Sequence, residues 1–167
     1  MLFRSYFDGD SDSLSRMVVP EKTVLITDEH VYAARKKFFS KWDVIVLKPG
    51  EAYKQQRVAD AVIEQLIEKG ADRSTTLVGV GGGVVTDMTG YIASVYLRGI
   101  GFGFIPTSLL AMVDASIGGK NGIDVGVYKN MVGAIRQPDF LLYDYNWLKT
   151  LPLDRKSTRL NSSHTVI

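Results

Sequence analysis

The chain has 167 residues, 46% of them hydrophobic, which is enough for a domain with its own core. The 20 Lys and Arg residues nearly balance the 18 Asp and Glu residues and form no basic stripe, so we expect no nucleic-acid partner. The absence of cysteine excludes disulfides and thiolate metal sites and fits a reducing compartment. The N-terminus lacks the apolar run of a signal peptide, and no stretch approaches the roughly 20 apolar residues that span a bilayer. We therefore expect a cytoplasmic protein without a membrane partner.

Short β-branched runs alternate with helical segments along the chain. In chain order the pattern predicts strands over residues 24–28, 44–47, 75–80, 102–105 and 140–143. It predicts helices over residues 29–39, 54–69, 84–97 and 109–113, and a short turn through 147–148 to 152. This alternation favours an α/β fold, a Rossmann-like parallel sheet with helices on both faces. Ligands of such sheets bind at the carboxyl ends of the strands, where Asp28, the glycines at 81–83 and Thr107 fall.

Three consecutive glycines, residues 81–83, join a buried strand to a helix. They do not satisfy the GxGxxG fingerprint in any register. The backbone amides of such a loop still bind a pyrophosphate, although a tight turn without a ligand is the alternative. We place Asp87 in the first helical turn, where the helix dipole favours a carboxylate. After Pro106, Thr107 and Ser108 offer hydroxyls that cap the next helix or contact a cofactor.

A second group of polar residues lies on glycine-rich segments after Asp114. Gly118, Gly119 and Gly122 predict flexible loops that carry Lys120, and Lys129 and Asn130 follow closely. Two lysines and an amide suit a phosphate or a polyol, and solvated surface lysines are the alternative. The apolar residues on either side favour a loop that packs against the body of the domain.

The remaining polar residues carry weaker signals. Arg98 ends a predicted helix, where any cation interacts favourably with the helix dipole. The two histidines are His30, expected at a helix start, and His164. With no cysteine beside them, no metal site can be assembled from neighbouring residues of this chain.

The runs GGGVVTD, YLRG, PTSLLAMVDASIGGKNG, KNMVGAIRQP and LKTLP closely resemble the 3-dehydroquinate synthase family of sugar-phosphate cyclases, over residues 24–152. The resemblance implies an NAD-binding domain. Together with the glycine loop, it assigns cofactor contacts to Asp28, Glu51, Lys54, Gly81, Gly82, Gly83, Val84, Asp87, Thr107, Ser108, Lys120, Lys129 and Thr150. It assigns the substrate-facing, catalytic positions to Arg98, Asp114, Lys120 and Asn130. Two positions depart from the family pattern: Thr86, where glycine is common, and Ser108, where threonine is usual.

The implied reaction converts 3-deoxy-D-arabino-heptulosonate 7-phosphate to 3-dehydroquinate and phosphate in the shikimate pathway of aromatic amino acid biosynthesis. NAD is used and regenerated in each turnover. Lys120, Asn130 and Arg98 would bind the phosphate of this small-molecule substrate, with Arg98 reaching the site of a neighbouring subunit in a homodimer. Asp114 would order substrate hydroxyls.

The family's second, helical domain, which binds zinc or cobalt, has no counterpart in this sequence. We therefore expect residues 1–154 to be the N-terminal half of the enzyme, and the chain alone to be inactive. Residues 155–167 are polar and serine-rich and match nothing in the family, so we expect a non-native or disordered tail. The alternatives are another sugar-phosphate cyclase or polyol dehydrogenase, a stand-alone NAD-binding module without catalysis, and an inert fragment.

Overall fold

The structure is a computed structural model that describes residues 4–7, 9–10 and 12–151. The predicted tail at 155–167, His164 and the last residues of the predicted domain, 152–154, lie outside the described residues.

A parallel sheet forms the centre of the described part of the chain. Six strands pair in the order β1-β8-β5-β4-β2-β3, and every pairing in this sheet is parallel. Their bounds are β1 Arg4–Tyr6, β2 Thr23–Asp28, β3 Asp43–Leu47, β4 Thr76–Gly81, β5 Gly101–Pro106 and β8 Phe140–Leu142. The predicted Rossmann-like parallel sheet is therefore confirmed, with β1 as an additional edge strand that the sequence did not predict.

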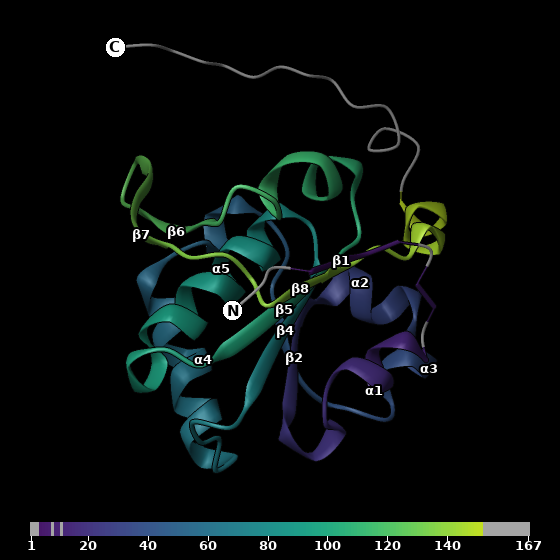
Figure 1. Ribbon diagram of the computed structural model, residues 1–167. Coiled ribbons are helices and arrows are strands. Elements are labelled where there is room, and N and C mark those ends of the chain that lie inside the picture. Colours follow the sequence, from purple (N-terminus) through teal and green to yellow (C-terminus); the bar gives the residue numbers. More distant parts are fainter. Residues whose placement is uncertain (1–3, 8, 11, 152–167) are drawn as a thin grey trace.

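Helices cover both faces of this sheet (Figure 1). The helices α4 (Gln56–Glu68) and α5 (Gly83–Val95) lie on one face, and α1 (Ser13–Met17), α2 (Glu29–Ala34) and α3 (Lys36–Phe39) lie on the other. Successive strand residues point to opposite faces, so Ile26 packs in the core below α4 and α5, whereas Leu25 packs with Phe39 and Trp147. Each of these helices is too short or too polar to cross a membrane.

The described residues also contain five short helical turns. Four are 3-10 turns, η1 Pro20–Lys22, η2 Glu51–Tyr53, η3 Tyr96–Arg98 and η5 Tyr145–Thr150, and the fifth is a π-helical turn, η4 Ala111–Ala115. Two of the predicted helices are shorter than expected. The predicted helix at 29–39 is interrupted at Arg35, which has non-helical backbone angles (φ −142°, ψ 49°). The predicted helix at 84–97 ends at Val95, because Leu97 and Arg98 adopt left-handed conformations.

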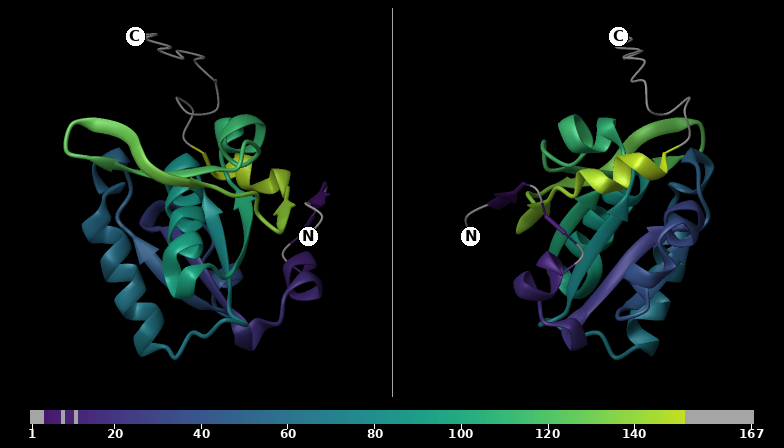
Figure 2. Two further views of the ribbon diagram at one scale, coloured as in Figure 1. Left: turned by 60° about the vertical axis from the view of Figure 1, so that its left-hand side comes forward. Right: turned by 90° about the vertical axis from the view of Figure 1, so that its right-hand side faces the viewer.

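The glycine-rich segment from Gly118 onward is an antiparallel hairpin, so the prediction of flexible loops there was wrong. Strand β6 (Lys120–Val125) pairs with β7 (Tyr128–Ile135), and the hairpin lies across one end of the molecule with its tip projecting outward (Figure 2). A side chain at Gly133 would collide with the backbone oxygen of Asn121. This glycine allows close strand pairing rather than flexibility.

Candidate functional site

The carboxyl ends of the central strands bring the predicted ligand-binding residues together. Asp28 ends β2, Gly81 ends β4, and Thr107 follows β5 directly. The backbone N–H of Thr107 donates to the carbonyl oxygen of Gly81 at 2.9 Å, so the glycine loop and the Thr107 segment are joined. The predicted meeting of these three positions at one edge of the sheet is confirmed.

The three glycines of the loop have different physical roles. A Cβ atom on Gly81 would lie 2.5 Å from the Cβ of Val85, so close packing of α5 on β4 already requires glycine there. A Cβ on Gly82 would meet only the Ser108 hydroxyl, and one on Gly83 only the Ala115 methyl, each at 3.5 Å. Those are ordinary contacts. Internal packing therefore explains Gly81 but leaves Gly82 and Gly83 without a reason inside the described residues.

Gly82 and Gly83 form the N-terminus of α5, a helix of 13 residues. Gly82 is the N-cap residue, and within the described part of the chain no side chain caps the helix. The first backbone N–H groups of a helix have no intrahelical acceptor and favour an anion. Val84, which follows them, is partly exposed. The loop therefore presents helix N–H groups that no side chain of the described residues caps.

Lys54 links two other predicted site residues. Its side chain is buried, and its Nζ donates to Asp87 Oδ2 and to Asn130 Oδ1, each at 2.5 Å. Burial raises the pKa of the Asp87 carboxyl, and the Lys54 ammonium opposes that increase. Asp87 lies beyond the first turn of α5, which contains no acid, so its predicted position in that turn was wrong. Its carboxylate is held by Lys54 instead of by the helix dipole.

Asp124 on β6 completes this network, and the sequence analysis did not identify it. It is buried, with 8% of its surface exposed, and its Oδ1 accepts the backbone N–H of Asn130 at 2.7 Å. Its own N–H donates to the carbonyl oxygen of Lys54 at 2.8 Å. The alternation of apolar and polar residues from Gly122 to Val125 was the signal for a strand, but the nearby glycines obscured it.

Two predicted residues already make local hydrogen bonds. Asp28 Oδ1 accepts the backbone N–H groups of His30 and Val31, so Asp28 caps α2 and His30 is a helix-start residue, as expected. The Ser108 hydroxyl accepts the N–H of Ala111, which confirms its predicted capping role.

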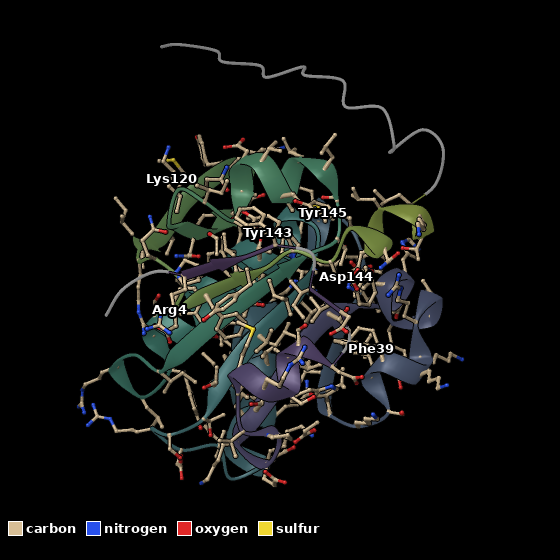
Figure 3. The ribbon with its side chains drawn as sticks, turned by 45° about the vertical axis from the view of Figure 1, so that its right-hand side comes forward. Arg4, Phe39, Lys120, Tyr143, Asp144 and Tyr145 are labelled. Atoms are coloured by element: carbon tan, nitrogen blue, oxygen red, sulfur yellow. The ribbon has the colours of Figure 1, made fainter. Side chains whose placement is uncertain are left out.

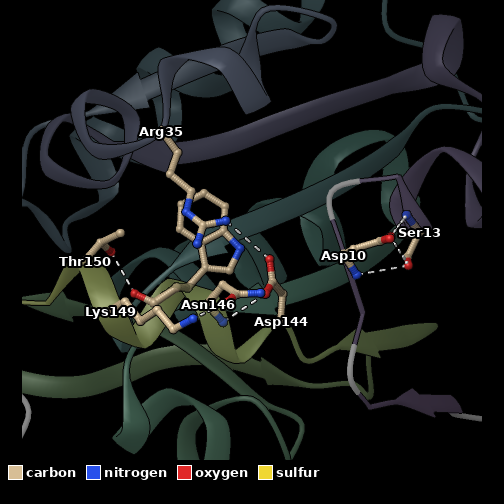
Figure 4. A network of polar contacts seen from close by, with 8 residues as sticks. Asp10, Ser13, Arg35, Asp144, Asn146, Lys149 and Thr150 are labelled. Carbon is tan, nitrogen blue, oxygen red and sulfur yellow. Dashed lines mark hydrogen bonds and ion pairs between the residues drawn. The ribbon is translucent and has the colours of Figure 1, made fainter.

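The last predicted cofactor residue, Thr150, lies on η5, which is anchored by a partly buried ion pair (Figure 4). The Arg35 guanidinium lies 4.5 Å from the centre of the Trp147 ring and 3.4 Å from Asp144 Oδ2. Asp144 in turn accepts the backbone N–H of Asn146 and caps η5, and Thr150 donates its hydroxyl to Trp147 O. This anchor explains why the chain breaks its helix at Arg35.

Other predicted residues are exposed and, among the described residues, form no side-chain hydrogen bond with the network. They are Glu51 in η2, Asp114 in η4, and Lys120 and Lys129 on the hairpin strands. Lys120 lies at the outer surface, whereas Tyr143 and Asp144 are enclosed (Figure 3). Arg98 follows the far end of α5, about 20 Å from the glycine loop at 1.5 Å per residue.

A separate hollow of about 700 Å³ lies along β1 and β8. Arg4, Tyr6, Arg16 and Phe140 are among its lining residues. It contains none of the predicted site residues. In the ranges 4–7, 9–10 and 12–151, no group of three His, Cys, Asp or Glu residues is arranged to hold a metal ion.

The fold and its edge site define a Rossmann-like domain of the sugar-phosphate cyclase type. A 2-deoxy-scyllo-inosose synthase, complexed with carbaglucose-6-phosphate, NAD⁺ and Co²⁺, superposes with a TM-score of 0.77 and 26% identity, over 92% of this chain and 44% of that one. The 2-epi-5-epi-valiolone synthase of Streptomyces hygroscopicus subsp. jinggangensis 5008, with NAD⁺ and Zn²⁺ bound, shares the fold at a TM-score of 0.85 and 23% identity, over 93% of this chain and 46% of that one.

The family model for the 3-dehydroquinate synthase N-terminal region matches residues 44–158, and the chain belongs to this family. It is 46% identical over 140 residues to the 3-dehydroquinate synthase of Streptococcus thermophilus, covering 79% of this chain and 39% of that enzyme. It is 50% identical over 107 residues to the pentafunctional AROM polypeptide of Komagataella phaffii, covering 64% of this chain and 7% of that polypeptide. The chain thus spans about two fifths of the length of the bacterial relative. The resemblance stated from the motifs is confirmed.

Proposed function

We propose that this chain is the cofactor-binding part of a 3-dehydroquinate synthase, which converts 3-deoxy-D-arabino-heptulosonate 7-phosphate to 3-dehydroquinate and phosphate. The observation that carries the proposal is the uncapped N-terminus of α5 at Gly82 and Gly83, where internal packing does not account for the glycines. The chemistry that bound NAD would supply is reversible hydride transfer with a substrate alcohol.

The residues around α5 fit the parts of this cofactor. The pyrophosphate would meet the N–H groups that follow Gly82 and Gly83. Asp28 uses only Oδ1 for its cap among the described residues, so Oδ2 is free to accept a ribose hydroxyl. Thr107, Ser108 and Thr150 supply further hydroxyls near the ends of β5 and β8. These positions support a dinucleotide that lies across the carboxyl edge of the sheet.

The hairpin would supply the contacts to the substrate. Lys54 donates to Asn130 Oδ1, which leaves the Asn130 amide N–H groups free to donate to a phosphate or a hydroxyl. Lys120 would add positive charge for the phosphate, Asp114 would accept substrate hydroxyls, and Lys129 would contact the cofactor. Arg98 lies far from the glycine loop. This position supports the proposal that Arg98 reaches the site of the second subunit in a homodimer.

Metal chemistry is not assigned to the described residues. They do not fit a zinc or cobalt site, since no three ligands of the kind needed lie together. We propose that the divalent metal is bound by parts of the enzyme outside the described residues. We expect the purified chain to release no phosphate from the heptulosonate phosphate.

The test is calorimetric titration of the chain with NAD. The proposal predicts binding in the micromolar range for the natural chain and its loss in Gly82→Val, which fills the space above α5. Equal affinity in the two proteins would contradict the placement, and no binding to the natural chain would contradict the cofactor assignment.

The likeness to two other cyclases supports a second candidate, a sugar-phosphate cyclase with a different substrate. A panel of ketose and aldose phosphates, tested for phosphate release with the full-length gene product, separates the two. Release from the heptulosonate phosphate alone favours the synthase.

A further inference from the structure

A β-bulge at Asp124 interrupts the hairpin next to the proposed site. Ile123 pairs with Val132 and Val125 pairs with Tyr128, so the register shifts at Asp124. The bulge turns the backbone N–H of Asp124 toward the carbonyl oxygen of Lys54, and Asp124 forms a parallel bridge with Gln55. Bulges commonly redirect a side chain in this way. This one joins the hairpin to the segment that carries Lys54.

The carboxylate of Asp124 holds the backbone of Asn130. Asn130 has a φ of 55°, in the left-handed region that non-glycine residues seldom adopt. Asp124 Oδ1 accepts the N–H of Asn130 at 2.7 Å, which is a charge-assisted hydrogen bond between a buried carboxylate and the backbone of an exposed residue. Lys54 holds the other end of Asn130 through its side-chain oxygen. Two buried charged groups therefore fix this single residue.

We propose that Asp124 is a positioning residue, which holds Asn130 in its left-handed conformation and locks the β6–β7 hairpin to Lys54. Through this contact the cofactor side of the site, with Lys54 and Asp87, and the hairpin side, with Asn130, form one unit. The effect on binding rests on the function proposed above, whereas the effect on the hairpin does not.

Amide hydrogen exchange of the full chain, followed by NMR, tests the structural half. Asp124→Ala should lower the protection of the residue-130 amide and of the β6–β7 ladder by about tenfold or more, as expected for loss of a hydrogen bond to a charged group. Asp124→Asn keeps a hydrogen-bond acceptor without the charge and should lower this protection by about threefold. If Asp124→Ala does not fold, the exchange protection of Asp124→Asn tests the proposed hold on Asn130. Val127→Ala, at an 88% exposed position in the same hairpin, is the matched control and should change nothing.

A rescue variant separates positioning from general damage. Asn130→Gly alone removes the Lys54 contact to Asn130 Oδ1, so this variant is the reference for the rescue. Glycine adopts a positive φ without strain, so adding Asp124→Ala to Asn130→Gly should lower the ladder protection much less than Asp124→Ala does in the natural chain. An equal loss in the two backgrounds, or unchanged protection in the single Asp124 variants, would overturn the proposed hold on Asn130.

NAD affinity of the same proteins tests the binding half. Asp124→Ala should weaken NAD binding by about fivefold or more, within the usual range for coupled sites, and Val127→Ala should not. Unchanged affinity in Asp124→Ala would refute the coupling to the cofactor side. If the natural chain binds no NAD, the proposed function is wrong, and the hydrogen-exchange data still test the role of Asp124 in the hairpin.

Discussion

Gly81 and Gly82 are neighbours, yet alanine at each should have a different effect. A methyl group on Gly81 would lie 2.5 Å from the Cβ of Val85, a buried and β-branched residue that cannot move away alone. The helix must shift, and overpacking of this kind costs about 1–3 kcal/mol of folding stability. Gly81→Ala should therefore lower the urea midpoint clearly.

Alanine at Gly82 should leave the fold intact. The residue has an ordinary φ of −79°, and the new methyl would meet only the Ser108 hydroxyl at 3.5 Å. The lower N-cap preference of alanine costs about 0.5–1.5 kcal/mol, and the reduced entropy of the unfolded chain offsets about 0.4–1 kcal/mol. The free energy of unfolding should thus change by less than about 1 kcal/mol.

The same methyl would occupy the approach to the helix N-terminus. Overpacking of about 1–3 kcal/mol against a pyrophosphate corresponds to about 5- to 150-fold weaker NAD binding. Urea denaturation and calorimetric titration of both variants give the two quantities. If Gly82→Ala binds NAD as well as the natural chain, the pyrophosphate does not lie at this loop. If Gly81→Ala keeps full stability, the packing argument for Gly81 is wrong.

Three further outcomes follow from the described contacts. Burial raises the pKa of Asp87, so its carboxylate is less favourable in the folded chain than in the unfolded one. The stability of the natural chain relative to Asp87→Asn should therefore fall as pH rises above the ordinary pKa of 3.8. Urea titrations across pH measure this difference, and a relative gain in stability would contradict the prediction. Arg35→Ala should lower the free energy of unfolding in urea by about 2–3 kcal/mol, because it leaves the buried Asp144 without its charged partner. Arg35→Lys should lose less, because it keeps the charge but not the planar stacking on Trp147. Equal losses of stability in the two variants would argue against stacking. In the full-length enzyme Lys120→Ala should lower kcat/KM by about 30- to 1000-fold, the loss of about 2–4 kcal/mol from one phosphate contact, and near-normal kinetics would show that Lys120 is a solvated surface lysine.

The sequence predicted those features that rest on short-range patterns. Continuous apolar runs such as that around Val78 mark strands buried on both faces, and the glycines after β4 mark the ligand-binding edge. Both follow from local composition. The order of the strands in the sheet required the structure.

The missed features depend on contacts between distant residues. The break at Arg35 has no glycine or proline to announce it, because its cause is Trp147, more than a hundred residues later. Gly122 suggested a flexible loop, although it lies in strand β6, where a Cβ atom would meet the backbone oxygen of Val132 at 2.9 Å. Asp124 showed no motif, since its role depends on a bulge and on the positions of Lys54 and Asn130. Such long-range packing overrides local propensity.

The most direct test of the proposed cofactor site is an NMR titration of the ¹⁵N-labelled chain with NAD. Binding at this edge of the sheet predicts saturable shifts of the amide signals of Gly82, Gly83 and Thr107, together with residues near Asp28, and small changes around Arg4 and Arg16 at the separate hollow. Shifts confined to the hollow along β1, or no saturable shifts at all, would contradict the assignment of this edge of the sheet as the cofactor site.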